Sequence, residues 1–187
     1  MKVYLITDTH FNHEKIKEYC NRPDNYEELL WKGLESLPAD CLLIHLGDVC
    51  FGKDQEVHDR IKKLPYQKIL VRGNHDKKSD QWYLLNGWNV VVDEFSNHYF
   101  GKYITFSHIP IAGIQNLNIH GHFHNTLHRL QEGNWVVEGE KERNEEVLKI
   151  LTSNHKLLAV EYTDYKPISL EKFLAPLIDI RFNTFNK

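Results

Sequence analysis

The sequence predicts an α/β fold in which two mixed β-sheets pack together and helices cover their outer faces, forming a four-layer αββα sandwich. In the first half, apolar segments alternate with amphipathic helical segments, an order typical of a parallel sheet covered by helices. In the second half, short apolar segments follow one another without long helices between them, which indicates hairpins and a more antiparallel second sheet. The length of 187 residues and the hydrophobic content of 41% suit one globular domain.

Three buried strands are predicted in the first half, at residues 3–7, 41–46 and 68–71. Between the first two strands, apolar residues recur at spacings of three and four from residue 26 to residue 37, which predicts an amphipathic helix capped by Asp24 or Asn25. The apolar residues of segment 57–64 have a similar spacing and predict a second helix.

Five shorter strands are predicted in the second half, at residues 90–92, 95–100, 103–107, 118–120 and 157–162. Asn97 and Gly101 are candidate turn residues between them. The charged segment 138–146 predicts an exposed loop that leads into a helix near residues 143–152.

The charge and cysteine content narrow the classes of function. The 23 basic and 26 acidic residues give a net charge of −3, which disfavours nucleic acid as a partner. The first segment turns polar after six residues, and no run approaches the roughly 20 apolar residues of a membrane span, so we expect neither a signal peptide nor a membrane partner. Three cysteines without a CxxC pair predict reduced thiols and a cytoplasmic location.

Side chains of the types that commonly bind metals follow five of the predicted strands, each at the carboxyl end. The five clusters are Asp8-Thr9-His10, Gly47-Asp48, Gly73-Asn74-His75-Asp76, Ser107-His108 and Gly121-His122-Phe123-His124. The carboxyl ends of the strands are where open α/β sheets bind their ligands. Each cluster alone is a weak signal, but the five together predict one metal site at this edge.

The ligand types and their spacing constrain the metal. Asp8 and His10 are two residues apart, as are His122 and His124, and in an extended chain such pairs face the same side. Carboxylate, imidazole and amide donors without a thiolate suit manganese, iron or zinc. Seven candidate ligands are too many for one ion, and two ions roughly 3.5–4 Å apart can share a bridging carboxylate.

In this order, the motifs DxH, GD, GNHD, an isolated His and GHxH resemble those of the calcineurin-like metallophosphoesterase family. The motifs span residues 8–124, about two thirds of the chain. The longer strings DTHFNHEKIKEYCNRP and YKPISLEKF resemble a subgroup of small prokaryotic and phage phosphoesterases. The resemblance therefore implies a single metallophosphoesterase domain over residues 1–187.

The resemblance also implies a role for each motif residue. Two divalent ions would be held, one by Asp8, His10 and His124, the other by Asn74, His108 and His122, with Asp48 bridging both. His75 would bind no metal, but would protonate the leaving oxygen or stabilise the transition-state charge while a metal-bridging hydroxide attacks phosphorus. Manganese is the expected ion, with iron, zinc and nickel as alternatives.

Other residues near the motifs have more than one interpretation. His13 and Arg22 lie near the first motif and are candidates for contact with the substrate, or for a structural role. Asp76 either orients His75 or supports the loop from behind. His45 lies within an apolar strand and is interpreted as a core histidine. The aromatic residues Trp82, Tyr83, Trp88 and Trp135 are interpreted as packing residues, with stacking on a nucleobase as the alternative.

The expected function is hydrolysis of a small phosphodiester or nucleotide-type phosphate ester. In the family's protein phosphatases the second motif is GDxxDRG and the third GNHE, whereas here Asp48 is followed by Val49-Cys50-Phe51-Gly52 and the third motif ends in Asp76. The alternatives are a phosphomonoesterase, a nuclease and a non-catalytic protein-binding scaffold. The net charge counts against the nuclease, and the complete motif set counts against the scaffold.

Overall fold

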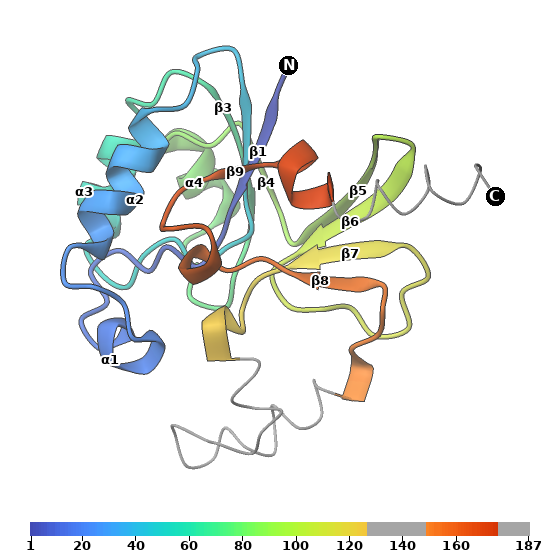
Figure 1. Ribbon diagram of the computed structural model, residues 1–187. Coiled ribbons are helices and arrows are strands. Elements are labelled where there is room, and N and C mark those ends of the chain that lie inside the picture. Colours follow the sequence, from blue (N-terminus) through green and yellow to red (C-terminus); the bar gives the residue numbers. More distant parts are fainter. Residues whose placement is uncertain (127–148, 176–187) are drawn as a thin grey trace.

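The first of two β-sheets contains the amino-terminal strand of the chain (Figure 1). The computed structural model describes residues 1–126 and 149–175. The strands of this sheet are β1 (Val3–Ile6), β2 (Leu42–His45), β3 (Gln67–Val71), β4 (Val90–Val92) and β9 (Ile168–Ser169). Their order is β4-β3-β2-β1-β9, with β1 to β4 parallel and β9 antiparallel to β1.

The second sheet is mixed and contains strands from the second half of the chain. Its strands, in spatial order, are β5 (Glu94–Tyr99), β6 (Lys102–Ser107), β7 (Leu117–His120) and β8 (His155–Leu157). Among the described strands of this sheet, β5 and β6 form the one hairpin, and the β6–β7 and β7–β8 pairs are parallel. The expectation of hairpins and a more antiparallel second sheet is therefore confirmed for the β5–β6 pair and wrong for the other two pairs.

Helices flank the sheets. The labelled helices are α1 (Ile16–Cys20), α2 (Tyr26–Glu35), α3 (Asp54–Ile61), α4 (Asp80–Leu85) and the 3-10 turns η1 (His124–Thr126) and η2 (Val160–Tyr162). Residues 149–150 and 170–175 are also helical. In Figure 1, α2, α3 and α4 lie on the same side of the first sheet. The predicted strand 157–162 was wrong after its first residue, because the chain turns into η2 at Val160.

Alternate residues of the central strands pack into two separate cores. Leu5 and Ile44 belong to a cluster that also contains Ile104 of the second sheet, so this core lies between the sheets. Ile6 and Leu43, their chain neighbours, belong to a second cluster with residues of α2 and α3. Since both faces of the first sheet are buried, its strands need apolar residues at most positions, as in Val3–Ile6 and Val90–Val92.

The register of the sheets brings the carboxyl ends of their strands together. Ile6 is paired with His45, so the loops that follow β1 and β2 leave the sheet at the same level. The Asp8 amide then donates to the Gly47 carbonyl at 2.9 Å, and the Gly121 amide donates to the His108 carbonyl at 3.0 Å. These bonds tie the polar clusters to one another.

Some sequence predictions fall beyond the described ranges. The charged segment 138–146, most of the helix predicted near residues 143–152 and Trp135 lie outside the described residues. Within the described ranges, no helix is long and apolar enough to cross a membrane. The three cysteines are free and buried.

Candidate metal centre

One group of predicted ligands forms around the carboxylate of Asp8. The ligand atoms of Asp8, His10 and His124 lie within 4.8 Å of one another. Asp8 Oδ1 is 3.8 Å from His10 Nε2 and 3.7 Å from His124 Nε2. The other oxygen, Oδ2, accepts hydrogen bonds from Thr7 Oγ1 at 2.6 Å and the His122 amide at 3.0 Å. These bonds orient the carboxylate so that Oδ1 faces the two imidazoles.

A second group forms around the Nε2 atom of His108. Asp48 Oδ2 is 3.4 Å from this nitrogen, Asn74 Oδ1 3.0 Å and His122 Nδ1 3.2 Å. The Nδ1 atom of His108 lies 2.7 Å from the Leu46 carbonyl, to which it donates, so Nε2 is the nitrogen that faces the group. Four donor atoms from four separate loops therefore surround one point.

Asp48 lies between the two groups. Its Oδ2 atom is 3.5 Å from His10 Nε2 in the first group and 3.4 Å from His108 Nε2 in the second. Its Oδ1 atom accepts a hydrogen bond from the His75 amide at 2.8 Å. One oxygen thus holds the loop of the third motif, while the other is placed where a carboxylate could bridge two ions.

Most of these ligands have an uncommon backbone conformation. Asp8, His10, Asp48, His122 and His124 all have positive φ angles, between 46° and 74°. Non-glycine residues rarely adopt this left-handed conformation, and such strain is concentrated at functional sites. The assumption of an extended chain at these pairs was therefore wrong. Asp8 and His10 still face one group, whereas His122 and His124 face different groups.

Unpartnered buried atoms indicate that the first group fits a cation. Asp8 Oδ1 and His10 Nε2 are buried without a hydrogen-bond partner. An unpaired buried polar group costs about 1–3 kcal/mol, and a divalent ion between a carboxylate oxygen and an imidazole nitrogen would satisfy both atoms. The donor set of carboxylate, imidazole and amide oxygen suits a hard or borderline divalent ion.

Two glycines permit the loops to approach the carboxylates. A Cβ atom on Gly73 would overlap Asp48 Oδ1, and one on Gly121 would overlap both Asp8 Oδ2 and Thr7 Oγ1. Neither position tolerates a side chain without moving a candidate ligand. The glycines of the third and fifth motifs are therefore required by close packing against the carboxylates.

The carboxylates and imidazoles of the site perturb each other's pKa values. Burial opposes ionisation of Asp8 and Asp48, but the surrounding histidines outweigh it and lower the pKa of Asp8 well below its usual value and that of Asp48 to about 2. Burial lowers the pKa of His10 and of His122 to about 4, so both rings are neutral and able to bind metal at pH 7.

His108 and His124 behave in the opposite way. Burial disfavours the charged ring of His108, but its hydrogen bond to Asp48 and the charge of Asp8 raise its pKa to about 9. The pKa of His124 is also raised, because Asp8, Cys20 and Glu161 outweigh its burial. In the metal-free protein these two rings are therefore protonated at pH 7.

A buried ion pair lies behind His124. Arg22 Nη2 is 2.7 Å from Glu161 Oε1, and the guanidinium also donates to the Asp8 carbonyl at 2.8 Å and the Thr9 carbonyl at 3.0 Å. Glu161 Oε1 is 3.5 Å from His124 Nδ1, on the opposite side of the ring from Asp8. Arg22 Nη2 is also 3.2 Å from His124 Nδ1, so the ion pair as a whole orients the ring of this candidate ligand. The side chain of Arg22 is fully buried, behind the ligands.

Glu161 was missed by the sequence reasoning. Its only signal was an acidic residue inside the apolar segment 157–162. Cys20 lies beside it, with ligand atoms of Cys20, His124 and Glu161 within 4.8 Å of one another.

Asp76 holds two of the motif loops together. Its Oδ2 atom accepts from the amides of Asp48 and Gly73, both at 2.8 Å, and its Oδ1 atom accepts from the Val49 amide at 3.1 Å. None of these three hydrogen bonds involves the side chain of His75. Of the two interpretations from the sequence, the structure favours support of the loop from behind.

His75 and His13 lie on the open side of the centre. The side chain of His75 is 36% exposed, and its Nε2 atom is 3.9 Å from Asp48 Oδ2. The ring centroids of His75 and His13 are each 5.4 Å from that of His10. His13 Nδ1 accepts a hydrogen bond from the Ile16 amide at 3.0 Å, so in the neutral ring the proton is on Nε2. Burial lowers the pKa of His13, which favours that neutral form.

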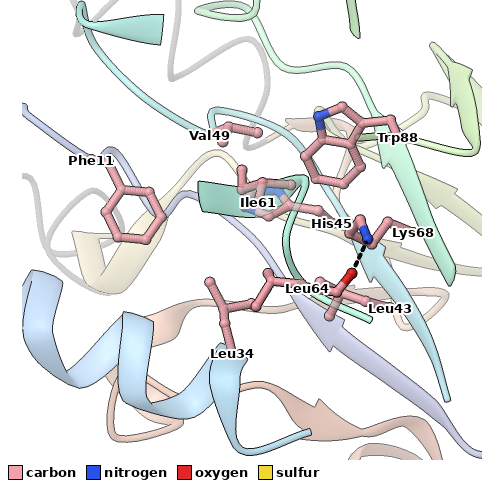
Figure 2. A pocket seen from close by; sticks show the side chains of 9 residues that line it. All are labelled: Phe11, Leu34, Leu43, His45, Val49, Ile61, Leu64, Lys68 and Trp88. Atoms are coloured by element: carbon pink, nitrogen blue, oxygen red, sulfur yellow. Dashed lines mark hydrogen bonds between the residues drawn. The ribbon is translucent and has the colours of Figure 1, made fainter. Parts of the chain in front are cut away.

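A small cavity between the first sheet and helices α2 and α3 is separate from this centre (Figure 2). Its volume of about 10 Å³ holds at most one water. His45 and Trp88 line it, and a dashed line in Figure 2 marks the bond that Lys68 Nζ donates to the Leu64 carbonyl at 2.8 Å. His45 is 2% exposed and bonded to Thr9 and the Gly47 amide, which confirms its interpretation as a core histidine.

Comparisons with known proteins agree with the geometry. A family model described as calcineurin-like phosphoesterase matches residues 1–176. An uncharacterized protein of Methanocaldococcus jannaschii is 30% identical over 182 residues, which cover 91% of this chain and 88% of that protein. The crystal structure of a protein of unknown function from Aquifex aeolicus is similar with a TM-score of 0.65 and 29% identity, covering 94% of this chain and 98% of the other.

Proposed function

The chain belongs to the calcineurin-like phosphoesterase family and is a hydrolase of phosphoric ester bonds, and we propose that it hydrolyses a small phosphodiester of the nucleotide type with two divalent cations. The observation that carries the proposal is the position of Asp48 Oδ2, which is 3.5 Å from His10 Nε2 and 3.4 Å from His108 Nε2. A carboxylate oxygen between two sets of donors is the arrangement that a two-metal site requires.

The ligands divide into two sets that share Asp48. Asp8, His10 and His124 would hold the first cation, and Asn74, His108 and His122 would hold the second. When bound, the two cations supply Lewis-acid charge beside the phosphoryl oxygens and acidify the attacking water. Manganese is the proposed ion, since the donor set contains oxygen and imidazole nitrogen and no thiolate.

His75 is the proposed catalytic residue of the protein itself. Its partly exposed ring lies beside the shared carboxylate, and its amide is fixed by the 2.8 Å bond to Asp48 Oδ1. From this position the ring can donate a proton to the leaving oxygen or a hydrogen bond to the transition-state charge. General acid catalysis of this kind contributes about 10²–10⁴-fold to the rate.

His13 is proposed to bind the substrate. Since its Nδ1 atom accepts from the Ile16 amide, its Nε2–H is left to donate to a phosphate oxygen. Arg22 is instead proposed to position the ligands, because its guanidinium binds the Asp8 and Thr9 carbonyls and Glu161.

The test is hydrolysis of paired chromogenic esters by metal-free protein resupplied with Mn²⁺. We expect turnover of bis(4-nitrophenyl) phosphate that needs metal and falls about 10²–10⁴-fold in His75→Ala, with unchanged metal content. His98→Ala, which removes an exposed histidine of β5, is the matched control. Turnover of 4-nitrophenyl phosphate alone would favour the phosphomonoesterase. Absence of turnover in the metal-loaded protein would refute the proposal.

A further inference from the structure

Phe51 is a large apolar side chain that stays exposed beside the metal centre. It is 50% exposed and lies three residues after Asp48. Single exposed apolar residues are common on protein surfaces, so its exposure alone decides nothing. Its neighbours are more informative, because its ring lies 4.4 Å from that of His13 and 5.4 Å from that of His75.

The rings of Phe51, His13, His75 and His10 form a cluster in which each ring contacts two of the others. His10 is 5.4 Å from His13 and from His75, and Phe51 closes the group on the exposed side. His10 is a candidate metal ligand, and His75 and His13 are the proposed partners of the phosphate. The Phe51 ring is therefore within reach of a substituent on an ester whose phosphate lies beside His75.

The backbone holds Phe51 in a defined position. Its amide donates to the Phe11 carbonyl at 2.8 Å, and Cys50 forms a β-bridge with Phe11. The same two loops are also joined at His10, whose amide donates to the Asp48 carbonyl at 3.0 Å. Because its backbone is held in this way, Phe51 loses little backbone freedom on binding, which favours affinity.

We propose that Phe51, flanked by His13, is a stacking platform for a planar ring of the substrate, and that this ring is a nucleobase. The inference rests on the proposed function and adds the part of the substrate that gives specificity. Bases stack on aromatic side chains through their π-faces, so the platform selects esters that contain a base without reading which base it is. Of the aromatic residues suspected from the sequence, Tyr83 and Trp88 do not fill this role, since they are 1% and 3% exposed.

The experiment compares the binding of AMP and ribose 5-phosphate to Mn²⁺-loaded protein by isothermal titration calorimetry. The two ligands share the sugar and phosphate and differ by the base. We expect AMP to bind roughly 5- to 150-fold more tightly, the range for stacking of one base on an aromatic side chain. Phe51→Ala should bring this ratio to about one and leave the affinity for ribose 5-phosphate unchanged, whereas Phe51→Trp should keep the ratio.

Phe100→Ala is the matched control, because Phe100 is 53% exposed at the turn between β5 and β6. Its AMP preference should equal that of the wild type. AMP binding no tighter than ribose 5-phosphate, or a preference that survives in Phe51→Ala, would overturn the platform. Since binding is read without turnover, a protein that prefers AMP but hydrolyses no ester would refute the proposed function and leave the platform standing.

Discussion

Metal loading should release protons from His108 and His124. Both rings are protonated at pH 7 in the metal-free protein, because neighbouring carboxylates and hydrogen bonds outweigh the effect of burial on their pKa values. A metal ion binds only the deprotonated nitrogen, so its binding must displace the proton. His10 and His122, with pKa values of about 4, are already neutral and release none.

The size of the effect follows from the pKa of His108. With a pKa of about 9, two units above pH 7, this ring is about 99% protonated, and its ion displaces nearly one proton. The affinity for that ion should therefore rise about tenfold for each pH unit between 7 and 9. His124 contributes in the same direction, so loading both ions at pH 7 should release at least the one proton of His108.

Calorimetric titration with Mn²⁺ in two buffers of different ionisation enthalpy measures the number of released protons. The wild type should release about one proton per chain more than His108→Gln, because the glutamine has no proton to lose. His98→Gln, at an exposed position in β5, should match the wild type. Proton release near zero in the wild type, or an affinity independent of pH between 7 and 9, would refute the reasoning.

Three further changes test the support of the site. Glu161→Gln should weaken the first metal site about 10–100-fold, because His124 loses the carboxylate that orients it, as equilibrium dialysis would measure; unchanged affinity would contradict this. Asp76→Ala leaves three backbone amides without their acceptor and should lower the free energy of unfolding by about 3 kcal/mol or more in urea titrations. A loss below about 1 kcal/mol would argue against the role of Asp76 in holding the two motif loops together. The metal-free protein should lose stability as pH falls from 6.5 toward 3, since burial lowers the pKa of His45 to about 3 and the unfolded chain takes up the proton first; His45→Gln should reduce this slope.

The strands of the first sheet could be predicted because both faces of the sheet are buried, which demands apolar residues at most strand positions. Leu5 and Ile6 pack into different cores, yet both must be apolar, so the strand is visible without knowledge of its partners. The segment 157–162 misled the prediction for a related reason. It is as apolar as a strand, but Glu161 turns inward to bond with Arg22, 139 residues away in the chain. A contact of that sequence separation leaves no local pattern.

The candidate ligands were recognisable as residues, but their geometry was not. Spacing of two residues was taken to place side chains on one side, as in an extended chain. His122 and His124 instead have φ angles of 74° and 51° and face different groups. The position of Phe51 beside His13 and His75 likewise depends on contacts between three loops, which composition and periodicity do not record.

The central claim is that two cations share the carboxylate of Asp48, and metal content per chain tests it most directly. The wild type loaded with Mn²⁺ should hold two ions per chain after desalting. Asp48→Asn keeps an oxygen for the His75 amide but removes the bridging charge, so it should lose both ions and activity together, while Asp93→Asn, an exposed control, should keep both. Two ions retained in Asp48→Asn with full activity would contradict the account.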